Sequence, residues 1–151
     1  MRALMRIVIV IPMAYLLASL AAGYLIYSAW QISGRLPPVS PVFDSFELVL
    51  GGFFMSMMFA TIALPLSTIA IITCELMKVR GFLTYTLVGL AHGMVLVWMA
   101  ADNFRFDTYG DAFFNNMPEG AETYLAGGAI WGIAYWIMAG RLAGFGFERT
   151  K

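Results

Sequence analysis

Four long stretches of almost uninterrupted apolar residues limit this chain to one class of fold. The stretches cover about residues 7–30, 48–74, 82–101 and 123–140. About 20 apolar residues suffice to cross the hydrocarbon core of a bilayer as a helix. A helix also satisfies its own backbone in lipid, and these stretches lack the alternation of a membrane barrel strand. The sequence therefore predicts an all-α integral membrane four-helix bundle, in a single domain over residues 1–151.

The composition supports a chain that is immersed in lipid. Hydrophobic residues make up 61% of the 151 positions and charged residues only 12%, whereas roughly 25% of a soluble domain is charged. The formal net charge is zero, which argues against a partner that is a nucleic acid. A single cysteine, Cys74, excludes an intramolecular disulfide. The lipid bilayer is the first expected partner.

The first apolar stretch has a competing interpretation. Arg2 and Arg6 precede it, and Ser19-Leu20-Ala21 would suit a small-residue cleavage site, as in a secretory signal peptide. The stretch continues to Trp30, however, which is too long for the core of a signal peptide. We therefore expect a membrane span.

The basic residues predict the orientation. Seven of the nine lie in segments on one side of the predicted spans, and only Arg35 and Arg105 lie on the other; the seven are Arg2, Arg6, Lys78, Arg80, Arg141, Arg149 and Lys151. Basic loops stay in the cytoplasm. The prediction is a multi-pass protein of the bacterial inner membrane with both termini in the cytoplasm.

The two predicted outer loops, residues 31–47 and 102–122, differ in character. The first contains three prolines, which favour an extended link. The second mixes acidic residues with five aromatic rings, which predict contact with the outer membrane interface or a cap over the bundle; they are Phe104, Phe106, Tyr109, Phe113 and Phe114. Asp107 and Asp111 are best interpreted as a solvated acidic face, because their spacing fits no calcium loop.

Glycines at four-residue intervals predict close helix packing. Gly89 and Gly93 form one pair, Gly128 and Gly132 a second, and Gly140 and Gly144 a third, with the last four on one slowly drifting helix face. Glycine lets a second backbone approach closely, which is how membrane helices gain packing energy. The first interpretation is packing inside this bundle. The alternative is a seam with another membrane protein or with a second copy of the chain.

His92, near the middle of the third stretch, is the only histidine. Polar groups at that depth usually face the bundle interior, so a hydrogen bond to a Ser or Thr of another span is the first interpretation. The alternative is a cofactor ligand for haem or a metal, with Met55 and Met58 as weak candidates for soft sulfur ligands. No resident cofactor is predicted.

Pro65 interrupts the second stretch, close to Thr61, Ser67 and Thr68. Proline removes one helical hydrogen bond and kinks a helix, and nearby hydroxyls can bind the freed carbonyls. A kink that only shapes the helix is the first interpretation. A transporter site is the alternative, although the spans lack a central carboxylate and Glu75, at the inner end, is a weak candidate for proton coupling.

No motif of a known enzyme chemistry occurs, so an enzyme is not predicted. The ending GGAIWGIAYWIMAGRLAGF, with its glycine-studded helix followed by Ala-Gly-Arg-Leu-Ala-Gly, resembles that of small four-helix bacterial membrane proteins. This resemblance covers the last quarter of the chain and implies no activity or site residue. The predicted function is an accessory, assembly or interaction subunit of a membrane complex. The alternative is a small transporter or ligand-binding membrane protein centred on His92.

Overall fold

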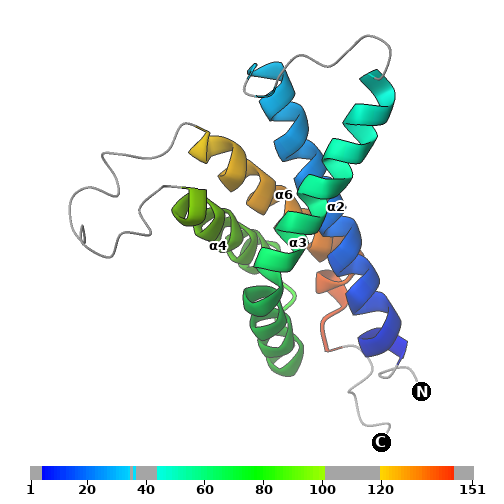
Figure 1. The fold of residues 1–151 in the computed structure, drawn as a ribbon. Helices are drawn as coiled ribbons and strands as arrows, with labels where there is room; N and C mark the ends of the chain where they lie inside the picture. Colours follow the sequence, from blue (N-terminus) through cyan, green and yellow to red (C-terminus); the bar gives the residue numbers. More distant parts are fainter. Residues whose placement is uncertain (1–4, 35, 37–43, 101–119, 145–151) are drawn as a thin grey trace, which may run out of the picture.

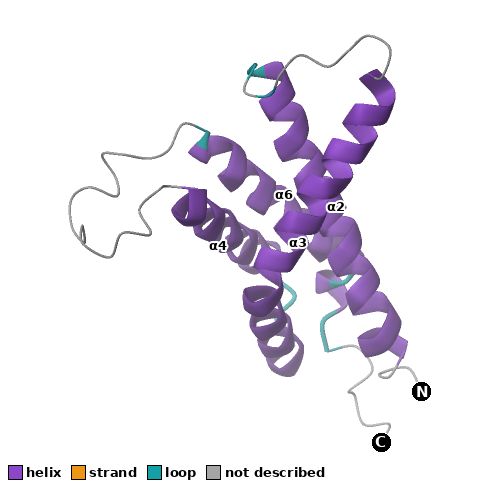
Figure 2. Cartoon of the chain, in the orientation of Figure 1, coloured by secondary structure: helices purple, strands orange, loops and turns teal. Residues whose placement is uncertain are grey.

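A computed structural model describes residues 5–34, 36, 44–100 and 120–144, and these residues are all helical apart from short turns (Figure 2). A π-helical turn, η1 (Arg6–Val10), runs directly into α2 (Ile11–Ile32). The following helices are α3 (Asp44–Met77), α4 (Phe82–Ala100) and α6 (Ala121–Met138), and a 3₁₀ turn, η2 (Gly140–Leu142), ends the described chain. The predicted helical fold is confirmed.

Three segments of the described chain are long and apolar enough to cross a membrane. They are Arg6–Ile32, Phe46–Met77 and Phe82–Met99, which indicates a membrane protein. Helix α6 does not belong to this group, because glycines, tyrosines and tryptophans hold many of its positions. Several of these residues are buried: Trp131 is fully buried and Tyr135 almost so, whereas Tyr124 and Trp136 are half-buried. Helix α6 is thus less apolar because it faces protein.

Helix α6 lies alongside α4 and also packs against α2 (Figure 1). Its N-terminal end meets the C-terminal end of α2, where the rings of Trp30 and Tyr124 form an edge-to-face pair with centroids 5.6 Å apart. Its other end meets the start of α4, where a Cβ on Gly140 would contact the Tyr85 ring. The two helices α4 and α6 are therefore antiparallel neighbours along their whole length.

The crossing of α4 and α6 is a contact of backbone with backbone. A Cβ added to Gly89 would overlap the carbonyl oxygen of Gly128, and one added to Gly128 would overlap the carbonyl oxygen of Gly89. The same holds for Gly132 against the carbonyl of Tyr85 and for Gly93 against the carbonyl of Tyr124. Each helix thus supplies two glycines to one interface. Only residues without side chains let the two backbones approach this closely.

The last two glycines of the predicted face are not on a helix with the others. Helix α6 ends at Met138, and Ala139 leaves helical geometry with φ −131°. Gly140 begins η2, and Gly144 has φ +72°, in the left-handed region that favours glycine. The expectation that Gly128, Gly132, Gly140 and Gly144 share one continuous helix face is wrong, because the chain turns after Met138 and brings Gly144 against the Lys78 side chain.

Helix α2 meets α6 through a row of small residues. Ala14, Ala18 and Ala22 are almost completely buried, and a Cβ on Gly127 of α6 would meet Ile26 of α2. Beside this row the indole Nε1–H of Trp131 donates a hydrogen bond of 3.2 Å to Ser19 Oγ. One polar contact therefore fixes the register of an otherwise apolar interface.

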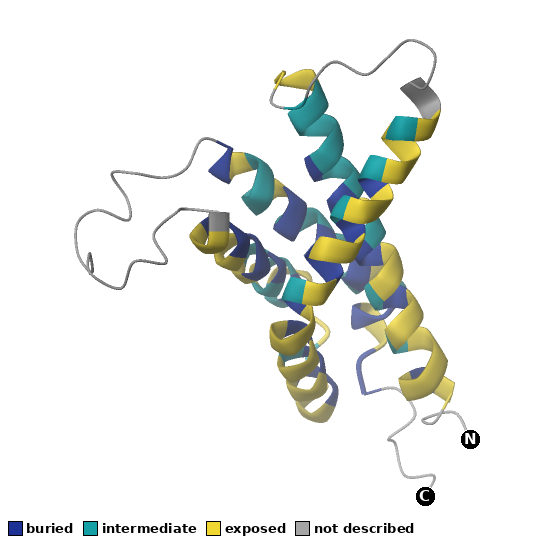
Figure 3. Ribbon diagram, viewed as in Figure 1, coloured by how far each residue is buried: buried dark blue, intermediate teal, exposed yellow. Residues whose placement is uncertain are grey.

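Helix α3 is the outer element of the structure. Along its N-terminal half it packs on α2, where a Cβ on Gly23 would overlap Ser56 and the Tyr24 hydroxyl donates to the Val49 carbonyl at 2.8 Å. Figure 3 shows the exposed positions that run along its outer side. Phe54 is 62% exposed and Ile69 67% exposed, as expected for residues that face lipid or another protein.

Candidate functional site

His92 is buried between three helices and bonded at both ring nitrogens. Its side chain is 2% exposed. Nδ1 lies 2.6 Å from the carbonyl oxygen of Val88, and Nε2 lies 2.9 Å from Ser67 Oγ on α3. A carbonyl can only accept, so Nδ1 carries the proton in the neutral ring, and the single proton of the Ser67 hydroxyl lies within reach of both Nε2 and the Ala63 carbonyl. The expected hydrogen bond to a Ser or Thr of another span is therefore formed, with Ser67.

The ring of His92 also rests on Trp131 of α6, with centroids 4.7 Å apart. This tilted ring contact, together with the bond to Ser67, joins α3, α4 and α6 at one point. Both nitrogens of the ring are already engaged within the chain, so a metal or haem would have to displace Ser67 to reach Nε2.

Met55 and Met58 lie away from His92. They line a cavity of about 330 Å³ with Trp30, Phe59 and other apolar side chains, and His92 does not line it. The carbonyl oxygen of Ala63 lies 3.2 Å from His92 Nε2. Met55 comes eight residues before Ala63 on α3, which corresponds to about 12 Å along a helix. The structure therefore does not bring the two methionines and the histidine together. Among the residues that it describes, no three His, Cys, Asp or Glu side chains form a group that could hold a metal.

Pro65 lies inside α3, which continues without a break from Asp44 to Met77. Side-chain hydroxyls bind the carbonyls around it: Thr61 donates to Met57 at 2.9 Å and Thr68 to Leu64 at 2.7 Å. The Ser67 hydroxyl lies 2.5 Å from the carbonyl oxygen of Ala63. The carbonyl that Pro65 leaves without its helical partner is that of Thr61, and none of these three hydroxyls donates to it. The hydroxyls therefore lie around the proline without replacing its missing bond, and one of them, Ser67, also contacts His92.

A buried ion pair joins the ends of three elements, and the sequence did not reveal it. Arg6 Nη2 lies 2.5 Å from Glu75 Oε1, and the two side chains are 6% and 10% exposed. Arg6 also donates to the carbonyl of Ala139 at 2.8 Å, and the Gly144 amide donates to Glu75 Oε2 at 2.7 Å. We call Arg6, Glu75, Ala139 and Gly144 the ion-pair cluster. It fastens the start of α2, the end of α3 and the turn after α6.

Further hydrogen bonds next to the ion-pair cluster join the same end of the bundle. Arg80 Nε donates to the carbonyl of Ala143 at 2.9 Å, and the indole of Trp136 donates to the carbonyl of Arg80 at 2.9 Å. Lys78, with φ 56°, ends α3 in the left-handed region. The short turn between α3 and α4 is therefore tied to the end of α6. The sequence suggested Arg6 only as a flanking basic residue and Glu75 as a weak candidate for proton coupling. One signal for the pair was available, because both residues lie at the same predicted end of adjacent spans.

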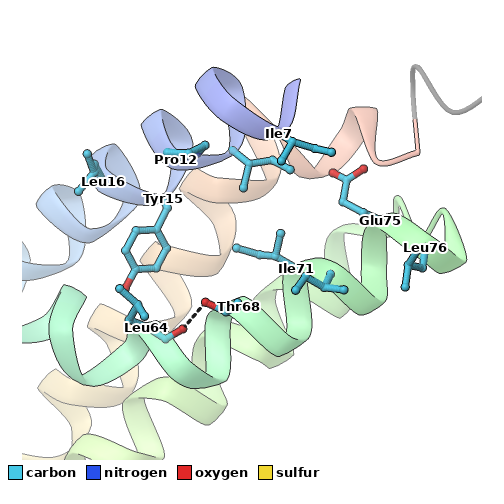
Figure 4. Close-up of a pocket in the computed structure, with 11 residues that line it drawn as sticks. Ile7, Pro12, Tyr15, Leu16, Leu64, Thr68, Ile71, Glu75 and Leu76 are labelled. Atoms are coloured by element: carbon cyan, nitrogen blue, oxygen red, sulfur yellow. Dashed lines mark hydrogen bonds between the residues drawn. The ribbon is translucent and has the colours of Figure 1, made fainter. Parts of the chain in front are cut away.

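An apolar groove of about 530 Å³ separates the N-terminal half of α2 from the C-terminal half of α3 (Figure 4). The turn η1 contributes Ile7 to it and α2 contributes Ile11 and Leu16. Helix α3 contributes Leu64, Ile71 and Leu76. Tyr15 and Thr68 also line it, but their hydroxyls donate to the carbonyls of Ala60 and Leu64. The carboxylate of Glu75 lies at one end (Figure 4).

The aromatic residues of the second predicted outer loop, Phe104, Phe106, Tyr109, Phe113 and Phe114, lie outside the described residues. Comparisons of the chain with protein-family models, with curated proteins and with solved structures found no match.

Proposed function

We propose that the chain is a four-span protein of the bacterial inner membrane, with both termini in the cytoplasm, that works as an accessory or assembly subunit of a membrane complex. In this role it would act by contact with another membrane protein rather than by chemistry of its own.

The fourth span is supported by the way α6 runs beside α4. The start of α6 lies against Gly93, in the C-terminal half of α4, and Gly140 lies against Tyr85, near the beginning of α4. Since α4 is itself apolar enough to cross a bilayer, a neighbour that runs antiparallel over the same length crosses it too. The 18 residues of α6 correspond to about 27 Å of helix, close to the thickness of the hydrocarbon core.

The orientation is supported by where the basic residues gather. Arg6 contacts Ala139, Lys78 contacts Gly144, and Arg80 contacts Ala143. These basic residues therefore belong to one end of the bundle, together with Arg141 of η2. A concentration of Lys and Arg at one end favours the cytoplasmic side.

The internal use of the buried polar groups is the observation that carries the proposed role. Among the described residues, six polar or charged side chains are buried: Arg6, Ser19, Ser56, Ser67, Glu75 and His92. Each is hydrogen-bonded to another part of this chain. Ionisable groups inside a membrane protein often mark an ion path or ligand site, but here they join helices to each other. What the bundle offers a partner is its outer surface.

The N-terminal half of α3 is the face that we assign to the partner. Phe46, Phe53, Phe54 and Met58 are exposed there, and no other described helix covers them. Aromatic residues and methionine are enriched at protein interfaces. Methionine also adapts its shape to the surface that it meets.

Photo-crosslinking in native membranes tests this assignment. A photoreactive phenylalanine at position 54 should yield one stoichiometric adduct with another membrane protein. The matched control is position 59, a phenylalanine on the same helix that is 1% exposed and should react only within the chain. Adducts with lipid alone at position 54 would contradict the proposed role.

Spectroscopy of the purified protein tests the alternative centred on His92. A ligand-binding protein would show a haem absorption band or a stoichiometric metal. The accessory role predicts neither, and predicts that the crosslinked partner co-purifies.

A further inference from the structure

The groove between α2 and α3 is apolar along most of its length and polar at one end. Its walls are aliphatic from Leu64 to Ile71, and the hydroxyls of Tyr15 and Thr68 are turned to backbone carbonyls. The exception is the end where Glu75 meets Arg6. A ligand that fits this pattern is a long apolar chain with a polar group at one end.

The length of the groove matches one leaflet of a bilayer. From Leu64 to Leu76, the residues of α3 that line it, a helix rises about 18 Å. One leaflet contributes about 15 Å to the hydrocarbon core. A transmembrane helix of a partner would need a groove about twice as long.

An exposed lysine lies near the polar end of the groove, although it does not line the groove itself. The Glu75 carboxylate is buried and neutralised by Arg6, whereas Lys78, one turn further along, is exposed. Its side chain lies over Gly144, whose amide binds Glu75. A lysine near the membrane surface attracts anionic headgroups.

We propose that the groove between α2 and α3 binds one acyl chain of an anionic phospholipid, from the leaflet on the side of the ion-pair cluster, with its headgroup beside Lys78. This site requires only that α2 and α3 span the bilayer, and it is independent of the accessory role.

Two threonines of α3 provide a matched test. Thr68 and Thr73 are both exposed, and each hydroxyl donates to the carbonyl four residues earlier, at 2.7 and 2.8 Å. Thr68 lines the groove and Thr73 does not. Thr68→Trp should fill the groove, whereas Thr73→Trp should leave it open. Ile72→Trp, at another exposed residue of the groove wall, is a second blocking variant.

The measurement is native mass spectrometry of the delipidated full-length protein in detergent with added phosphatidylglycerol. We expect a species with one bound lipid for the wild type and for Thr73→Trp, and its loss in Thr68→Trp and Ile72→Trp. Equal binding by all four proteins would overturn the site. Equal binding of phosphatidylcholine with the same acyl chains would overturn the anionic headgroup. If the wild type instead carries a second protein chain that the blocked variants lose, while lipid binding is the same in all four proteins, the occupant of the groove is a protein and not an acyl chain. Circular dichroism confirms that the variants compared are folded, and crosslinking from position 54 tests the accessory role separately.

Discussion

Single polar side chains in the spans act as fasteners between helices. His92 joins α4 to α3 through Ser67, and Trp131 joins α6 to α2 through Ser19. An interhelical hydrogen bond in a membrane contributes only about 0.6 kcal/mol, because the unfolded chain in the bilayer also finds partners. Such bonds therefore contribute little to the stability of the bundle, and their main effect is to specify which residues of neighbouring helices meet.

The substitutions His92→Gln and His92→Leu test this role of the histidine. Glutamine keeps a donor and an acceptor, whereas leucine leaves the Ser67 hydroxyl with only its bond inside α3. We expect His92→Leu to lower the unfolding free energy by about 0.6 kcal/mol, and His92→Gln to lower it less. Unfolding in mixed detergent micelles measures both, and Ser67→Ala is the control that removes the same bond from the other side. Loss of cellular function in both His92 variants, with unchanged stability, would indicate a ligand or proton-transfer role instead.

Tyr135 is the opposite case, because its hydroxyl is buried and has no hydrogen-bond partner in the part of the chain that the structure describes. Burying an unbonded polar group costs about 1–3 kcal/mol. Tyr135→Phe should therefore leave stability unchanged or raise it by about 1 kcal/mol, while the stacking of the ring on Trp131 remains. The control is Tyr85→Phe, which loses a bond to the Val79 carbonyl and should lower stability. If Tyr135→Phe is as destabilising as the control, a bound water serves the hydroxyl.

At the scale of helices, the contact between α4 and α6 depends on the absence of side chains. The four glycines that cross there bring carbonyl oxygens to the positions that Cβ atoms would occupy. Close contact of this kind leaves no room to relax, since both sides of the interface are backbone. For Gly89, Gly93, Gly128 and Gly132 the sequence predicted a close helix contact, because glycine lets two backbones approach. It left open whether that contact lies inside the bundle or with another chain.

Gly132→Ala tests the packing at this crossing. The new Cβ would overlap the carbonyl oxygen of Tyr85, and overpacking of this kind costs roughly 1–3 kcal/mol. The control is Gly81→Ala, where the new Cβ would lie 3.4 Å from Thr84 Oγ1, an ordinary contact. Detergent-resistant folding should fall for Gly132→Ala alone. A Gly132→Ala protein that folds like the wild type but loses a partner would mean that this face binds another chain.

The ion-pair cluster could not be predicted from the sequence in the same way. Arg6 and Glu75 are 69 positions apart, and a charged residue at the end of a span is equally compatible with a headgroup or with water. Only the folded arrangement of α2, α3 and the turn after α6 brings the two charges together. The same long-range dependence explains why the end of α6 and the placement of Gly140 and Gly144 were mispredicted.

Glu75→Gln tests how strongly the cluster fastens these elements. The substitution keeps an acceptor for the Gly144 amide but leaves the buried Arg6 charge without a counterion, which typically costs about 3–5 kcal/mol. The double variant Arg6→Met, Glu75→Leu should recover most of that loss, since it removes both charges. Arg141→Gln, at an exposed residue, is the control and should change stability by less than about 0.5 kcal/mol. A Glu75→Gln protein as stable as the control would contradict a buried pair.

At the scale of the whole molecule, a paired α4–α6 unit and the outer helix α3 are held together by α2 (Figure 1). The sequence predicted the helices and their order because apolar length is read directly from composition. It could not predict that α3 would separate from α2 at one end and leave a groove, because that shape depends on how the helices cross. The groove, the ion-pair cluster and the exposed face of α3 acquire a function only when the bundle is placed in the bilayer.

The placement of the chain in the membrane is the claim on which the rest depends, and reporter fusions measure it most directly. A reporter after Lys78 and another at Lys151 should behave as cytoplasmic, and a third near Gly110 should behave as external, because α4 crosses once between Lys78 and Gly110 and α6 crosses once between Gly110 and Lys151. This pattern requires that α4 and α6 both cross the bilayer with the C-terminus inside, and it places the ion-pair cluster and the polar end of the groove at the cytoplasmic leaflet. A cytoplasmic signal near Gly110 would contradict the four-span arrangement.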